Sequence, residues 1–175
     1  MPTPRAALLL HQLAVAEALL DYHLDGLGDA ECLWEPSPTS WTVRPDGAGG
    51  WAADWADTEP DPVPTPTIAW LMWHIDLWWT AALRECFGVP GPEMPVWPGS
   101  ATASAARLRA LVAAWRTCLD GVADADLDTR SVTLFGLAQP LSDALAWVTV
   151  ELTKNVAEIG SLRLLYAAHA ASRAR

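Results

Sequence analysis

The stretch from Leu141 to Tyr166 constrains the fold most, because it combines a long apolar stripe with a row of polar residues. Glu151, Asn155 and Glu158 stand at i, i+4 and i+7, so they lie along one side of a helix. Burying such a row costs free energy unless partners or a cavity receive it. The apolar residues recur at helical spacing and predict one buried face: Leu145, Val148, Leu152, Ile159, Leu162 and Tyr166. The pattern predicts a long helix with a polar pocket beside it.

The remaining periodicity predicts an all-α protein with a single domain spanning residues 1–175. Four helices are expected, at about residues 4–26, 67–87, 103–120 and 141–168. Together they predict a four-helix bundle, in which ligand and metal sites are built from inward side chains of facing helices. The run SVTLFG, residues 131–136, is compatible with a strand, a hairpin arm or a loop, and we interpret it as irregular.

A long Pro-, Gly- and Trp-rich loop joins the first two helices, from Gly28 to Pro66. So long a loop is unusual inside a compact domain and is often the lid or wall of a site. The loop contains four tryptophans, which either pin it to the core or line a pocket: Trp34, Trp41, Trp51 and Trp55.

The second helix contains one histidine, His74, between Trp70 and Trp78 at i−4 and i+4. This spacing predicts an imidazole stacked between two indoles. A lone histidine on an apolar face is usually a satisfied core residue, and the alternative is a metal ligand or an acid–base group. We expect His74 to meet Glu151 and Asn155 in one pocket, lined by Trp70, Trp78 and Trp41.

Composition excludes several classes of partner. The formal net charge of −10 argues against nucleic acid, because its binders need a basic face. No apolar run is long enough for a membrane span and no signal peptide is evident, so we expect a cytoplasmic protein without a membrane partner. Cys32, Cys86 and Cys118 fit no metal-finger spacing. They are interpreted as reduced buried thiols, with a nucleophilic Cys86 or Cys118 as the alternative.

Four segments resemble the DinB/YfiT-like superfamily: LLLHQL, DGLGDAECLWEPSPTSWTVRP, the P-x-P-x-P-TIAWLMWHI stretch and VELTKNVAEIGSLRLLY. The resemblance covers nearly the whole chain and implies a four-helix bundle, in agreement with the periodicity. It also implies a divalent metal, zinc or nickel, held by one histidine of the second helix and two residues one turn apart on the fourth. By motif position these are His74, Glu151 and Asn155.

Asn155 departs from the family pattern, because related sequences commonly carry two adjacent histidines where this chain has Lys154 and Asn155. An amide oxygen is a weaker ligand for zinc or nickel than a neutral imidazole. We therefore expect a degenerate metal site, with the metal weakly bound or absent.

The resemblance implies an enzyme acting on a small molecule, similar to mycothiol-dependent S-transferases or to maleylpyruvate isomerase, with mycothiol as an expected cofactor. Family members often dimerise, so a homodimer is one expectation. Three alternatives stay open. The first is a metal-free acid–base isomerase or cyclase in which His74 and Glu151 move a proton and Asn155 donates to an oxyanion. The second is a protein that binds an apolar or aromatic ligand in the Trp-lined pocket, and the third is a purely structural bundle.

Overall fold

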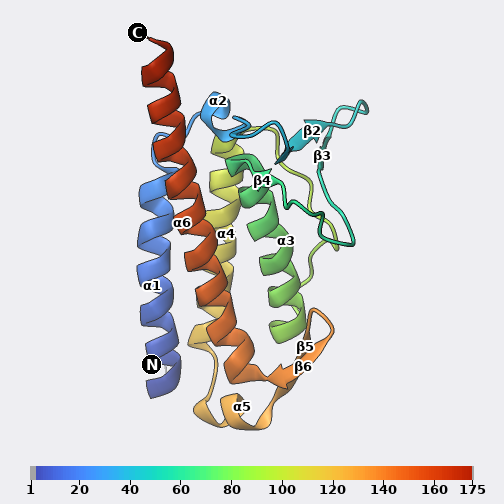
Figure 1. Ribbon diagram of the computed structural model, residues 1–175. Helices are drawn as coiled ribbons and strands as arrows, with labels where there is room; N and C mark the ends of the chain where they lie inside the picture. The colour runs from blue at the N-terminus through green and yellow to red at the C-terminus, as the bar shows by residue number, and fades with distance from the viewer. Residues whose placement is uncertain (1–2, 175) are drawn as a thin grey trace.

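Four long helices account for most of the computed structural model, which describes residues 3–174 (Figure 1). They are α1 (Pro4–Leu24), α3 (Ile68–Phe87), α4 (Ala101–Asp120) and α6 (Leu141–Arg173). Two short helices, α2 (Asp29–Cys32) and α5 (Asp124–Thr129), lie between them. The mostly helical fold predicted from the sequence is confirmed. The last helix continues to Arg173 rather than ending near residue 168, so its C-terminal end projects beyond α1 (Figure 1).

Local sequence signals explain where α3 and α4 begin and end. Thr67 caps α3, because its hydroxyl accepts a hydrogen bond of 3.2 Å from the backbone N–H of Trp70. Ser100 caps α4 in the same way, at 3.1 Å from the N–H of Ala103. Gly88 ends α3 with φ at +68°, a left-handed conformation that favours glycine.

Each of the four long helices packs against two others. α1 lies against α4 and α6, and α3 likewise lies against α4 and α6 (Figure 1). α1 and α6 run in one direction, whereas α3 and α4 run in the other. The contact between α1 and α6 is close at Gly160, where an added Cβ would collide with the imidazole of His23. A side chain at position 160 would therefore require His23 to move.

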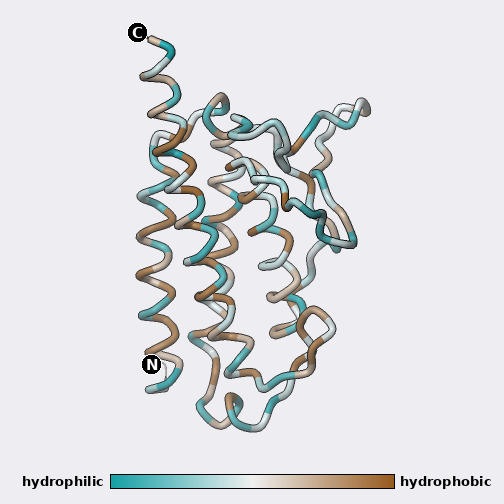
Figure 2. Tube along the Cα trace, viewed as in Figure 1, coloured by the Kyte–Doolittle hydropathy of each residue, from teal (hydrophilic) through white to brown (hydrophobic). Residues whose placement is uncertain are grey.

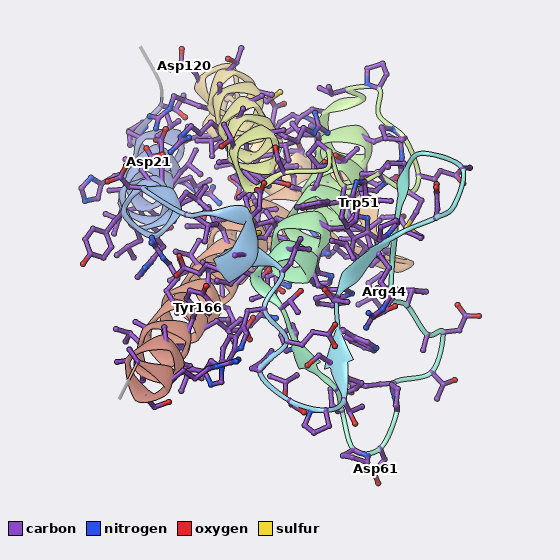
Figure 3. All side chains as sticks on the ribbon, turned by 90° about the horizontal axis from the view of Figure 1, so that it is seen from above. Asp21, Arg44, Trp51, Asp61, Asp120 and Tyr166 are labelled. Atoms are coloured by element: carbon purple, nitrogen blue, oxygen red, sulfur yellow. The ribbon has the colours of Figure 1, made fainter. Side chains whose placement is uncertain are left out.

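Two long connections cover the side of α3 that is away from α1. The first, residues 25–67, contains the parallel pair β1 (Ser40–Trp41) and β4 (Thr65–Pro66) and the antiparallel pair β2 (Val43–Pro45) and β3 (Trp51–Ala53). Seen from above, the part of it that contains Arg44, Trp51 and Asp61 lies beside α3, opposite Asp21 of α1 (Figure 3). The second, residues 88–100, returns along α3 and is fixed by a 2.8 Å hydrogen bond from the Trp73 indole to the Pro95 carbonyl.

A hairpin replaces the irregular segment expected around residues 131–136. It consists of β5 (Ser131–Leu134) and β6 (Leu137–Pro140), which pair antiparallel. The alternation of buried and exposed residues along β5 explains the strand, because Val132 and Leu134 point into the core. The sequence run was too short to separate this arrangement from a loop.

The core is rich in tryptophan as well as aliphatic residues. Trp79, Trp97 and Trp115 are among the largest fully buried side chains. Apolar segments recur along the four long helices, whereas much of the first connection is polar or neutral (Figure 2). Within residues 3–174, no helix is sufficiently long and apolar to cross a membrane.

Candidate functional site

His74 lies on α3 at the end of a stack of three aromatic rings. The imidazole is stacked on Trp70, with ring centroids 4.8 Å apart and the planes 9° from parallel. The third ring of the stack is that of Trp41 of β1, which is stacked on Trp70 with ring centroids 4.8 Å apart. The prediction that the indole of Trp78 also stacks on His74 is wrong, because Trp78 stacks on Trp79 instead, with ring centroids 5.4 Å apart. The stack holds the His74 ring in one orientation beside two cavities.

The first cavity has a volume of about 410 Å³ and is almost entirely apolar. Its polar lining consists of His74, Glu93 and Glu151. We call it the apolar cavity, and its other lining residues are Trp55, Leu77, Trp78, Ala81, Met94, Phe135 and Trp147. α3, α6, both long connections and the β5–β6 hairpin all contribute to its wall. The structure thus brings His74 of α3 and Glu151 of α6 to one cavity, on the flank of these two helices.

The second cavity, of about 440 Å³, shares His74 and Trp55 with the first. We call it the polar cavity, because Lys154, Asn155 and several carboxylates line it. Trp41 and Trp70, which the sequence predicted as pocket-lining residues, belong to this cavity, whereas Trp78 belongs to the apolar cavity. The carboxylates of the polar cavity are those of Asp57, Glu59 and Glu158.

Burial decides the charge of His74. Desolvation lowers its pKa to about 4, since an imidazolium loses hydration there. Glu151 acts in the opposite direction and raises the pKa, while Lys154 lowers it. The imidazole is therefore neutral at physiological pH. Its Nδ1 atom is buried and has no hydrogen-bond partner within the described residues.

Glu151 and Lys154 form an ion pair one turn apart on α6. Nζ of Lys154 lies 2.6 Å from Oε1 of Glu151, and the side chain of Glu151 is 14% exposed against 54% for Lys154. The carboxylate of Glu151 thus has one charged partner on the side of the polar cavity. Its position in the lining of the apolar cavity leaves it available to a ligand there.

Asn155 lines the polar cavity, to which His74 also belongs. It is 1% exposed, and its Oδ1 accepts a 3.0 Å hydrogen bond from the indole N–H of Trp78. Its Nδ2 donates to Oε2 of Glu158 at 3.2 Å. Both ends of the amide are thus engaged by protein groups. Asn155 orients Trp78, which forms part of the wall of the apolar cavity.

Glu158 and Arg163 of α6 do not pair with each other. Arg163 instead binds Glu31 of α2 at 2.9 Å, and it donates to the backbone carbonyls of His23 and Asp25. This arginine ties α6 to the end of α1 and to α2. Glu158 is left with Asn155 at the polar cavity.

Most of the chain also matches a known protein family. The model of the DinB superfamily matches residues 12–159. The chain belongs to the DinB superfamily. No match was found among curated proteins or among solved structures. Within the described residues of this DinB protein, no cluster of three or more His, Cys, Asp or Glu side chains could hold a metal ion.

The cysteines of this DinB protein lie in environments that suppress thiolate formation. Burial raises the pKa of Cys32 to about 12 and that of Cys86 to about 11. Burial also raises the pKa of Cys118. A nucleophilic cysteine needs a lowered pKa, so these residues are poor candidates for nucleophiles.

Six residues of the apolar cavity were missed by sequence reasoning: Leu77, Ala81, Glu93, Met94, Phe135 and Trp147. Trp147 is four residues before Glu151 on α6, so helical spacing could have placed both on one face. Met94 and Phe135 come from the second connection and from the hairpin tip, and no local pattern pointed to either.

Proposed function

We propose that this DinB protein is a metal-independent enzyme that moves a proton on an apolar small molecule, with His74 as the base. The observation that carries the proposal is that neutral His74 and the carboxylate of Glu151 line one apolar cavity. We interpret the four long helices as the DinB-type bundle and place the substrate on the flank of α3 and α6. The apolar lining favours a neutral substrate with an aromatic or other apolar body.

The two groups have distinct tasks in this proposal. His74 is unprotonated at neutral pH because burial disfavours its charged form, so its ring can accept a proton. Glu151 favours the charged imidazole and stabilises it as it forms. Return of the proton to a different carbon would complete an isomerisation. The low surrounding polarity strengthens the attraction between the imidazolium and the carboxylate.

The contacts of Asn155 argue against a three-ligand metal site. Its oxygen accepts a hydrogen bond from Trp78, so an ion would have to share with the indole an amide oxygen that is already a weak ligand for zinc or nickel. His74, Glu151 and Asn155 therefore do not fit the metal triad of the superfamily. We assign Asn155 the task of positioning Trp78, because its oxygen accepts the hydrogen bond of that indole.

The proposal is tested with 2-tetralone, a neutral aromatic ketone with an exchangeable C–H bond beside its carbonyl. In D₂O the wild-type protein should accelerate deuterium incorporation, followed by NMR. His74→Gln should reduce the rate about 100-fold, the usual contribution of a positioned base. The chelator EDTA should leave the rate unchanged. Equal rates for wild type and His74→Gln, or loss of exchange with EDTA, would contradict the proposal.

Thiol transfer with mycothiol is a second candidate function. Membership of the superfamily favours it, as does the buried Nδ1 of His74, which has no partner within residues 3–174. This candidate predicts turnover of mycothiol and an electrophile that rises with added zinc or nickel. Turnover of mycothiol that does not change with added metal would mean that the reaction differs from the metal-dependent mechanism of the family.

A further inference from the structure

The β5–β6 hairpin ends in a turn whose sequence does not suit its backbone. Leu134 pairs with Leu137, so Phe135 and Gly136 form a two-residue loop. Their φ angles are +52° and +79°, as in a type I′ turn. Asn, Asp and Gly are the residues that this turn favours at both positions. Phe135 is the one residue other than glycine with positive φ within residues 3–174.

Burial does not compensate for the unfavourable backbone of Phe135. The residue is 53% exposed, although the strands below it are anchored by Val132 and Leu134, which are 8% and 1% exposed. The base of the hairpin is also fixed by Arg130, which donates to the Cys86 carbonyl at 2.8 Å. The fold therefore holds the turn in place while leaving about half of the surface of Phe135 in solvent.

The ring of Phe135 lies at the wall of the apolar cavity. It meets Trp147 of α6 edge to face, with centroids 5.2 Å apart and an angle of 63°. Trp147 meets Trp78 of α3 in the same way, at 5.5 Å and 79°. The three rings form a continuous aromatic wall from the helices to the hairpin tip. Aromatic rings prefer such edge-to-face and offset contacts with other aromatic groups.

We propose that Phe135 makes the apolar cavity selective for a flat aromatic group, which its ring covers from the hairpin tip. The inference rests on the proposed function, because it assigns the substrate class of the same cavity. A bound aromatic group removes the exposed face of Phe135 from water. This gain offsets the unfavourable turn, which accounts for a phenylalanine where the backbone favours asparagine or glycine.

Two probes with the same carbon skeleton test the selectivity: 2-naphthol, which is flat and aromatic, and decahydro-2-naphthol, its puckered saturated analogue. Binding is measured by titration calorimetry. Wild type should bind 2-naphthol about 2- to 10-fold more tightly, the range expected for aromatic pairs. Phe135→Leu should lose this preference while binding both probes, and Phe135→Tyr should keep it. A preference retained in Phe135→Leu would overturn the inference.

The matched control is Leu137→Asn on the same hairpin. Leu137 is 69% exposed and does not line the cavity, so this variant should bind both probes as wild type does. Phe135→Asn suits the turn and should raise the thermal unfolding midpoint while weakening 2-naphthol binding. Opposite changes in stability and binding distinguish a ligand-contacting residue from a structural one. A fall in both would indicate that Phe135 serves the fold alone and would overturn the inference.

Ala81→Trp separates failure of this inference from failure of the proposed function. Ala81 lines the apolar cavity, so an indole at this position fills it and should abolish binding of 2-naphthol. If Ala81→Trp binds normally, the ligand lies elsewhere and the cavity assignment is wrong. If Ala81→Trp abolishes binding but Phe135→Leu keeps the preference, only the role of Phe135 is wrong. Absence of binding of both probes to wild type would overturn both.

Discussion

The two cavities beside His74 are nearly equal in volume, about 410 and 440 Å³, but differ in the chemistry of their walls. The apolar cavity has aromatic rings from four separate segments and two carboxylates. The polar cavity has Asp57, Glu59 and Glu158 together with the ammonium of Lys154. One imidazole thus borders two environments, and size alone would not tell which of them receives the substrate.

The difference indicates where proton transfer is favoured. In the apolar cavity, Glu151 is the carboxylate that acts on the charge of His74, and little polar surface competes with it. In the polar cavity, Lys154 opposes protonation of His74. A charge that forms on the imidazole is therefore stabilised from one side and opposed from the other. The following predictions test this asymmetry, from the largest expected effect to the smallest.

Filling the apolar cavity should slow deuterium exchange, whereas filling the polar cavity should leave its rate nearly unchanged. Ala81→Trp occupies the apolar cavity and should reduce deuterium exchange of 2-tetralone about 100-fold, to the level of a protein without its base. Ala56→Trp makes the same change in the polar cavity and should stay within about 2-fold of wild type. The reverse order of effects, measured by NMR, would place the substrate in the polar cavity.

Removing the amide that lies between the cavities should destabilise the fold. Asn155→Leu leaves the buried indole N–H of Trp78 without its acceptor, which should lower the free energy of unfolding by about 2–3 kcal/mol. Urea denaturation followed by circular dichroism measures this change. Ser161→Ala, at an exposed position of the same helix, is the control and should change stability by less than about 0.5 kcal/mol.

Stability should depend on pH through His74. The pKa is about 4 in the fold against 6.5 for an unperturbed imidazole, so the unfolded chain binds more protons between these values. Stability is therefore complete above pH 6.5, falls as pH drops toward 4, and loses on the order of 3 kcal/mol through this group. His74→Gln should lack this component in urea titrations at pH 4 and 7, and the exposed His11→Gln should retain it. Identical pH profiles for wild type and His74→Gln would refute the buried neutral imidazole.

The smallest predicted effect is that of replacing Lys154, which lines the polar cavity. Lys154→Gln removes the charge that lowers the pKa of His74 and releases Glu151 from its ion pair, so this pKa should rise. The rise should be less than about one pKa unit because Lys154 is half exposed and screened by solvent. Titration of the imidazole proton signal by NMR measures it. Arg163→Gln, whose partner is Glu31, is the control and should leave the pKa unchanged.

Sequence reasoning could predict what helical periodicity controls. The long helices, the placement of His74 on α3 and that of Glu151 on α6 follow from local spacing and from the packing of neighbouring helices. Trp147 was within reach of the same rule. Spacing could not predict the direction of an individual side chain. Asn155, for example, is oriented by a hydrogen bond from the indole of Trp78, which lies 77 positions away in the chain.

The remaining wall of the apolar cavity depends on long-range structure. Phe135 reaches it only because a two-residue turn projects from the hairpin, and Met94 only because residues 88–100 return along α3. Loop paths of this kind are set by what they pack against, and single-sequence patterns carry little of that information. The division of the site into two cavities therefore could not be derived from spacing.

The stack of Trp41, Trp70 and His74 gives the protein a built-in optical reporter. A protonated imidazole quenches the fluorescence of an indole in contact with it, whereas the neutral ring does so weakly. Because Trp70 lies face to face with His74, each proton gained or lost by that ring should alter the emission of this indole. Comparing emission spectra of wild type and Trp70→Phe would isolate the signal and allow proton transfer to be followed in real time without any label.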